Sequence, residues 1–66
     1  MVPSVLVLLA EGFEEVEAIT PIDLLRRSGA KVTVASLDTL AVKGAHGMVV
    51  HADTTLASCK NKPFDC

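Results

Sequence analysis

The sequence carries little net charge of either sign and has no basic run. Its six lysine and arginine residues are outnumbered by eight aspartate and glutamate residues, which gives a formal net charge of -2 at pH 7. A nucleic-acid surface needs a concentrated positive field, and an anionic membrane surface attracts polybasic segments. We therefore expect neither nucleic acid nor a membrane as a partner of this chain.

Cysteine is also scarce. The two cysteines, Cys59 and Cys66, are too few and too unfavourably spaced for a zinc ribbon, a CxxC redox pair or a disulfide framework. We therefore expect a reduced, cytoplasmic chain with no cysteine-based metal site.

The chain has no hydrophobic run long enough to cross a bilayer. The apolar run Val5–Ala10 is far short of the ~20 residues that a membrane-spanning helix needs. No basic residue precedes this run, and the acidic segment Glu11–Glu15 follows where a signal peptide would need small residues at its cleavage site. The run is instead typical of a strand that is buried on both faces in a parallel sheet.

The length of the chain limits what it can do alone. Half of its 66 residues are hydrophobic, a high share for a small independent domain. A core of this size rarely supplies more than ~3–5 kcal/mol of stability without disulfides, a metal or a partner. We therefore expect residues 1–66 to be the N-terminal part of one larger domain.

A helix is predicted from Glu14 to Arg27. Its apolar residues recur at helical spacing and form one buried face; they are Val16, Ala18, Ile19, Ile22, Leu24 and Leu25. Glutamates occupy the first turn and arginines the last, as the helix dipole favours. Because Pro21 lacks an amide hydrogen, we expect a kink there, with Thr20 able to cap a second helical segment.

Strands are predicted on both sides of this helix. Lys31–Ala35 is rich in β-branched residues, so that strand, helix and strand form one right-handed βαβ unit. Residues 40–43 and 48–51 flank a four-residue loop and predict a small hairpin, whose strands are a candidate added edge of the sheet.

The last residues predict a turn, a loop and the approach to another strand. Asp53 is expected to cap a short turn through Leu56, and Lys60–Pro63 to form a polar loop. Phe64–Cys66 then leads to the start of a further strand. A parallel sheet needs cover on both faces, and this chain offers one substantial helix, so we expect one face to be bare.

Two segments of the sequence resemble the DJ-1/ThiJ/PfpI superfamily. Residues 5–18 end in the pattern G-x-E-E-x-E, which is similar to the first strand and first helical turn of that family. Residues 20–35 contain P-x-D-x-x-R-R-x-G-x-K-V-T-V-A, similar to its first helix and second strand. Residues 47–53 and 63–65 agree more loosely. The resemblance implies a flavodoxin-like α/β three-layer sandwich with a parallel sheet, of which this chain supplies the βαβ unit and the edge hairpin.

The resemblance also implies a catalytic role for Glu17. It matches the family glutamate that hydrogen-bonds the sulfur of a reactive cysteine, which the family carries on a later nucleophile elbow that this chain lacks. Glu17 follows the C-terminal end of the first strand, on the edge where ligands bind in open α/β sheets. Beside a thiolate its carboxyl is expected to have a raised pKa and to relay a proton. Taken without the family, Glu17 is better explained as a solvated acid at a helix N-terminus, and the resemblance reverses this preference.

Four more charged or titratable residues are weighed in the same way. Arg27 resembles a family arginine near the active site across a dimer interface, where it would bind a substrate carboxylate or phosphate; a cation at a helix C-terminus is the simpler account. Glu14 is a candidate for the mouth of the substrate pocket, whereas Glu15 is expected to be a solvated acid. His46 stands where the family has a basic residue, which weakens a constitutive anion site.

The remaining histidine and the cysteines receive structural interpretations. The resemblance places His51 on an edge strand at the dimer interface, and ordinary packing or exposure explains it better than metal binding because no other ligand stands at the right spacing. Neither Cys59, expected in a polar loop, nor Cys66, at a strand start, matches the family nucleophile. Cys59 is expected to be the more oxidisable if it is exposed.

The resemblance implies a glutathione-independent glyoxalase or deglycase-type activity on small α-oxoaldehydes, with oxidative-stress sensing at the cysteine and no cofactor. The complete protein is expected to be an enzyme and a homodimer through the first helix. Its remaining part would be further chain or a second polypeptide, and the present chain alone would not be an enzyme. Two alternatives stay open: a redox-regulated chaperone or stress-response binding protein without turnover, and a PfpI-like cysteine peptidase.

Overall fold

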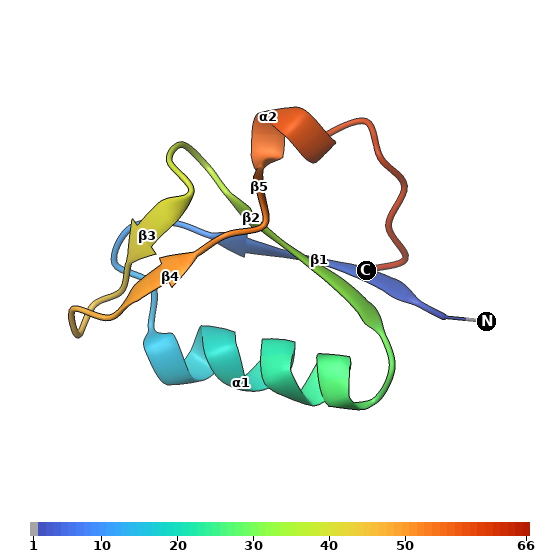
Figure 1. Cartoon of the computed structure of the whole chain (residues 1–66), viewed down its shortest axis with the longest axis horizontal. Helices are drawn as coiled ribbons and strands as arrows, with labels where there is room; N and C mark the ends of the chain where they lie inside the picture. Colours follow the sequence, from blue (N-terminus) through green and yellow to red (C-terminus); the bar gives the residue numbers. More distant parts are fainter. Residues whose placement is uncertain (1) are drawn as a thin grey trace.

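The computed structural model describes residues 2–66. Its elements in chain order are β1 (Ser4–Leu9), α1 (Glu15–Arg27), β2 (Lys31–Ser36), β3 (Ala41–Lys43), β4 (Val49–His51), β5 (Thr54–Thr55) and α2 (Leu56–Cys59). No helix within these residues combines the length and the apolar character that a membrane crossing requires. The result is an α/β fold in which α1 lies beneath a small parallel sheet (Figure 1).

The central sheet has the strand order β1-β2-β5, and both pairings are parallel. The register of β1 and β2 runs from Ser4 opposite Lys31 to Leu9 opposite Ser36. This pairing confirms the βαβ unit predicted from the apolar run, the amphipathic helix and the β-branched second strand. The C-terminal ends of β1 and β2 therefore lie at the same edge of the sheet, close to the start of α1 (Figure 1).

The hydrophobic core lies between the sheet and α1. Its buried members come from the helix, both long strands and the hairpin region, and are Leu9, Ile22, Val32, Val34, Val42 and Ala52. Every second residue of β1 and of β2 faces this core, because successive side chains of a strand point to opposite faces. The core is therefore formed by contacts between segments that are far apart in the sequence.

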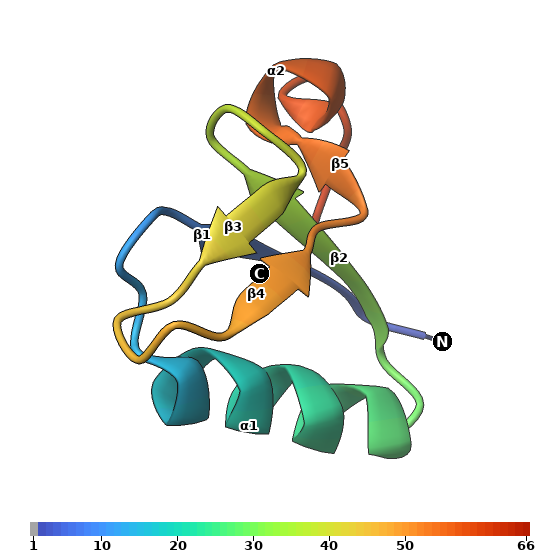
Figure 2. The same cartoon turned by 60° about the vertical axis from the view of Figure 1, so that its left-hand side comes forward.

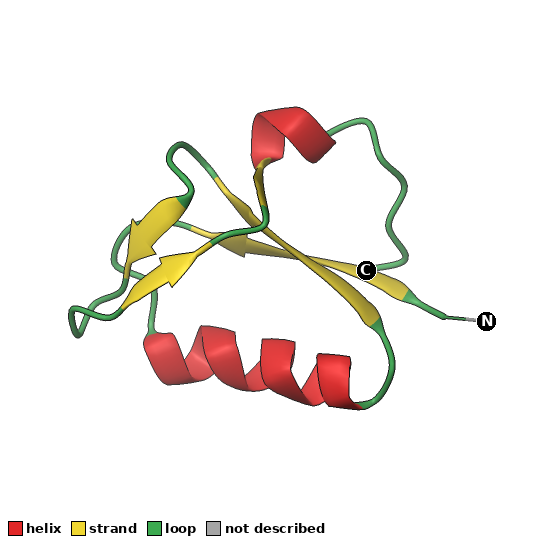
Figure 3. Ribbon diagram, in the orientation of Figure 1, coloured by secondary structure: helices red, strands yellow, loops and turns green. Residues whose placement is uncertain are grey.

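The opposite face of the sheet is covered only in part. The short helix α2 lies on that side (Figure 3), and it buries Cys59. Leu8 on β1 remains 51% exposed. The prediction that the first strand is buried on both faces was therefore wrong within these residues, because one long helix covers one face only. The expectation of a largely bare face is confirmed.

Helix α1 is continuous from Glu15 to Arg27 and contains Pro21. The second helical segment beginning at Thr20 is not formed. Proline removes one hydrogen bond in the helix, but Ile19, Ile22 and Leu25 on either side of it pack against the same core. The residues before and after Pro21 therefore present one continuous apolar face to the core.

The predicted hairpin is present, and β3 pairs with β4 in antiparallel register. It forms a separate two-stranded sheet, so the proposal that it extends the edge of the main sheet was wrong. The place beside β2 is taken by β5, which pairs at Ala35 and Ser36. The hairpin instead projects beyond the sheet towards the start of α1 (Figure 2).

Asp53 has a different role from the predicted helix cap. The residue that precedes α2 is Thr55, whereas the Asp53 carboxylate accepts hydrogen bonds from the Val34 amide at 2.9 Å and from Arg26 at 3.0 Å. Asp53 thus joins the chain before β5 to β2 and to α1. Its carboxylate reaches the sheet because Ala52 beside it is buried in the core.

The last residues run alongside β1. The amide of Cys66 donates to the Ser4 carbonyl at 3.2 Å, and the amide of Leu6 donates to the Cys66 carbonyl at 2.7 Å. These two bonds are the pattern of a parallel strand pair, and the Asp65 carboxylate also accepts from the Ser4 amide at 2.7 Å. The expected approach to a further core strand is therefore confirmed on the free side of β1.

The two cysteines have opposite environments. Cys59 lies in α2 and is buried, whereas Cys66 is exposed. The prediction that Cys59 lies in a polar loop was wrong, because a short helix precedes that loop and turns the thiol towards the sheet. Cys59 was expected to be the more oxidisable cysteine only if it were exposed, and it is buried.

Candidate functional site at the start of helix α1

The structure places Glu17 and Arg27 at opposite ends of α1. Ten residues of helix correspond to a rise of about 15 Å, so one copy of the chain does not bring the two side chains together. Glu17 is exposed, and among residues 2–66 its carboxylate makes no hydrogen bond or ion pair. Arg27 is exposed and pairs with Asp23 at 2.9 Å one turn earlier in the helix.

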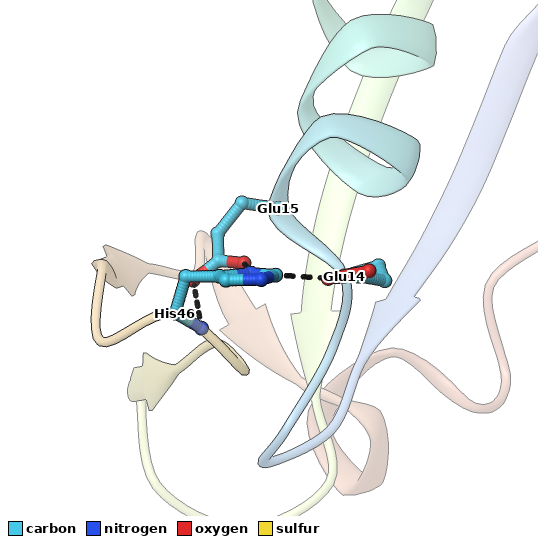
Figure 4. Close-up of side chains that lie close together, drawn as sticks. All are labelled: Glu14, Glu15 and His46. Atoms are coloured by element: carbon cyan, nitrogen blue, oxygen red, sulfur yellow. Dashed lines mark hydrogen bonds and ion pairs between the residues drawn. The ribbon is translucent and has the colours of Figure 1, made fainter.

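Glu14, the third predicted site residue, does meet a partner from a distant segment. Its Oε1 lies 3.1 Å from Nδ1 of His46, in the loop between β3 and β4 (Figure 4). Glu14 is the residue before α1, and its side chain makes no capping bond to the helix. It is therefore free to face the hairpin loop.

Glu15 is the residue that the sequence interpretation missed. It is only 7% exposed although it is the first residue of α1. Its Oε2 accepts hydrogen bonds from the backbone amides of His46 at 2.7 Å and Met48 at 3.3 Å, and its Oε1 lies 2.8 Å from Nδ1 of His46 (Figure 4). The prediction of a solvated acid was wrong, because the hairpin loop folds over this carboxylate and supplies donors that replace water.

The electrostatics of this contact favour the charged pair. Burial raises the pKa of Glu15, but the hydrogen bond from the His46 side chain, a bond from its own backbone and the amides of His46 and Met48 outweigh this and lower the pKa from 4.5 to about 2. The same hydrogen bond to Glu15, with the negative charge of Glu14 and then of Glu15, raises the pKa of His46 above 6.5. Protonated His46 donates from Nδ1 between the two carboxylates.

Gly44 makes room for the buried carboxylate. A Cβ atom at this position would lie 2.5 Å from Oε2 of Glu15. The amide of Gly44 also pairs with the Met48 carbonyl at 2.8 Å, and the neighbouring Ala45 amide donates to the Phe13 carbonyl at 2.8 Å. The loop is thus fixed to the chain before α1 by both backbone and side-chain contacts.

His46 was expected to weaken an anion site, and the structure gives a reason. The positive charge that His46 acquires is directed at two carboxylates of the same chain, so it is not available to a bound anion. His51, by contrast, is exposed on β4 and belongs to no group of three potential metal ligands among residues 2–66. No sequence spacing links residue 46 to residues 14 and 15, which is why the cluster was not found in advance.

A shallow cavity of about 340 Å³ lies at the carboxyl ends of β1 and β2. Its lining includes the last residues of both strands and the loops that follow, namely Leu9, Ala10, Glu11, Ser36, Leu37, Asp38, Thr39 and Val42. The Ser36 hydroxyl is buried and has no hydrogen-bond partner among residues 2–66. The edge of the sheet where α/β proteins bind ligands is therefore partly formed by this chain.

The fold and the site together define a class of protein. It is an α/β protein with a parallel β1-β2 pair and an acidic cluster where its first helix begins. Comparison with known proteins gives the family. The profile of the DJ-1/PfpI family matches residues 3–66, and the chain belongs to this family.

The individual similarities agree with this assignment. Protein dj-1beta of Drosophila melanogaster is 47% identical over 66 residues, which covers 98% of this chain and 35% of that protein. A deglycase of Thermococcus kodakarensis is 36% identical over 62 residues, covering 94% of this chain and 37% of its own length. The solved structure of oxidized Toxoplasma gondii DJ-1 is 45% identical with a TM-score of 0.95, over 97% of this chain and 35% of that one.

The chain spans little more than a third of these relatives. For the DJ-1 homologs A and B of Arabidopsis thaliana, which are 44% and 45% identical over 63 residues, the shares are 16% and 14%. The comparisons therefore establish the family and the fold of this segment.

Proposed function

We propose that this chain is the N-terminal part of a DJ-1/PfpI domain that acts on small α-oxoaldehydes, with a glyoxalase or deglycase-type reaction at a cysteine in the remainder of the domain. Membership of the family supports the class, and the name of the Thermococcus deglycase supports the reaction type. The observation that carries the proposal is the position of Glu17: an exposed carboxylate without a partner among residues 2–66, in the first turn of the helix that follows β1.

The proposed chemistry begins with attack of the cysteine thiolate on the aldehyde carbon, which forms a C–S bond and a hemithioacetal. Glu17 then carries a proton between carbon and oxygen as the hemithioacetal rearranges to a thioester. Water cleaves the thioester, which releases a hydroxy acid and returns the thiol. Glu17 is suited to this role because, among residues 2–66, it makes no ion pair that would hold it in the charged form.

Substrate binding is proposed for Glu14 and Arg27. Glu14 lies directly before α1, in contact with the hairpin loop through His46. Arg27 is at the far end of α1, so it reaches a site near Glu17 only from a second copy of the chain, which agrees with a homodimer through α1. Two large apolar residues on α1, Val16 and Leu24, are 70% and 60% exposed and support this interface.

The test is methylglyoxal consumption by the complete protein that contains this chain, with Glu17→Gln and the control Lys60→Gln, which also removes one exposed charge. Lys60 directly follows α2, away from α1 and from the cavity described above. Loss of a general acid–base group lowers turnover by about 10²–10⁴-fold. We expect a loss of this size for Glu17→Gln with unchanged thermal stability, and none for Lys60→Gln. Unchanged turnover in Glu17→Gln would remove Glu17 from the mechanism.

A redox-regulated binding protein is the second candidate. The similar solved structure of oxidized Toxoplasma gondii DJ-1 favours it, because that protein was observed in an oxidized state. In this scheme Glu17 stabilises an oxidised cysteine and no turnover is needed. Protection of an unfolding client from aggregation, with no consumption of methylglyoxal, would support this candidate over the enzyme.

A further inference from the structure

The first observation concerns three metal-ligating atoms that meet at the start of α1. One carboxylate oxygen from Glu14, one from Glu15 and a ring nitrogen of His46 all lie within 4.8 Å of one another. Two of these residues adjoin each other in the sequence and the third comes from the hairpin loop (Figure 4). Folding therefore assembles the group from two separate segments, in contrast to a run of acidic residues on a solvated helix turn.

The second observation is that Glu15 is fixed in position. Its Oε2 is held by the His46 and Met48 amides, at 2.7 and 3.3 Å, and the residue is 7% exposed. Its Oε1 remains directed at the His46 ring. Hydrogen bonds of this kind orient a carboxylate for binding through its other oxygen, as they do around established metal sites.

We propose that Glu14, Glu15 and His46 form a binding site for a divalent transition-metal ion of the zinc class, with water completing the coordination. Zinc takes both carboxylate oxygens and imidazole nitrogens as ligands, and its open sites combine three protein ligands with one water. With neutral His46 the three side chains carry two negative charges, which matches the charge of the cation. The site does not involve Glu17, and it shares only Glu14 with the residues of the proposed function.

The distances between the ligand atoms match those of a tetrahedral zinc site after a small outward movement of the exposed side chains. Nδ1 of His46 is 2.8 Å from the Glu15 oxygen and 3.1 Å from the Glu14 oxygen. Metal–ligand bonds of 2.0–2.2 Å in a tetrahedron separate the ligand atoms by about 3.4 Å. The side chains of His46 and Glu14 are 71% and 47% exposed, so they can open while Glu15 stays in place. Nδ1 then binds the ion through its lone pair, and the ring proton resides on Nε2.

The experiment is titration of the metal-free protein with zinc chloride by calorimetry, with its thiols kept reduced. We expect one equivalent to bind in the wild-type protein and affinity at least about tenfold lower in His46→Ala and in Glu14→Gln. Both substitutions change exposed side chains, and circular dichroism confirms that the variants fold. The matched control is His51→Ala, which removes the other histidine and should leave zinc binding unchanged.

Cobalt(II) gives a second readout. Its visible spectrum should show tetrahedral coordination without a thiolate-to-cobalt charge-transfer band. Three results would each overturn the proposal: no binding at millimolar zinc, binding that is unaffected by His46→Ala, or binding that is lost in Cys66→Ser. The last result would assign the ion to the exposed thiol of Cys66 instead.

Discussion

Glu15 illustrates how a charged side chain is accommodated at the margin of a small core. Removal of a carboxylate from water is costly unless donors replace the lost hydration. Here the two backbone amides of the hairpin loop and the His46 ring supply those donors. Their effect on its pKa exceeds the opposing effect of burial, so the carboxylate stays ionised and holds the loop against the helix.

The space around this carboxylate leads to a prediction for Gly44→Ala. The added methyl group would lie 2.5 Å from Oε2 of Glu15, and relief of this contact would break hydrogen bonds to the loop. Insertion of a methyl group into a packed site costs about 1–3 kcal/mol. We therefore expect the free energy of unfolding to fall by about this amount, as measured by urea denaturation.

A double-mutant cycle isolates the cause of this loss. In the background of Glu15→Ala the Oε2 atom that the methyl group would meet is absent, so Gly44→Ala should have little effect on stability. An equal loss in both backgrounds would show that the methyl group meets the backbone of the loop and would contradict the proposed contact.

Helix α1 presents apolar residues on two sides. Ile22 is buried against the sheet, whereas Leu24 is exposed and belongs to the proposed dimer interface. We expect Leu24→Asp to convert a dimer of the complete protein to monomer in analytical ultracentrifugation. Its effect on monomer stability should stay within about 0.5 kcal/mol, because the side chain is not in the core.

The control for this prediction is Leu37→Asp. Leu37 is 58% exposed but lies in the loop after β2, away from α1. The same change of charge there should leave the sedimentation coefficient unaltered. Dissociation by both substitutions would point to charge repulsion in general, and dissociation by neither would remove α1 from the interface.

The elements that the sequence predicted are those whose signals are local. The apolar run, the helical spacing from Val16 to Leu25 and the β-branched segment from Lys31 each reveal their structure within one window. The placement of the hairpin and the burial of Glu15 depend on contacts 31 residues apart. Periodicity carries no information about such contacts, so the βαβ unit was predicted and the cluster at its helix was not.

At the scale of the whole molecule, the ion pair between helix and hairpin predicts how stability varies with pH. The folded-state pKa of Glu15 is lowered, so its contribution is complete above 4.5 and is lost as the pH falls towards about 2. The folded-state pKa of His46 is raised, so its contribution is complete below 6.5 and is lost as the pH rises through that raised value. The combined contribution is greatest between pH 4.5 and 6.5.

We therefore compare the free energy of unfolding of wild type and His46→Gln from pH 4.5 to well above pH 6.5, with a chelator present to exclude metal. The difference between the two proteins should shrink as the pH rises above 6.5, because Glu14 and Glu15 then face a neutral ring. His51→Gln is the matched control, and its difference from wild type should not follow this profile. A difference for His46→Gln that is constant with pH would contradict the assignment.

The pairing of Cys66 with β1 has a consequence for association. Its bonds occupy the edge of β1 only at Ser4 and Leu6, and within residues 2–66 nothing pairs with that edge at Leu8. An unpaired strand edge with exposed apolar side chains is a template for strands of other molecules. A strand paired along this edge would therefore protect it, and an uncovered edge beyond Leu6 is a surface on which amyloid-like stacking can nucleate.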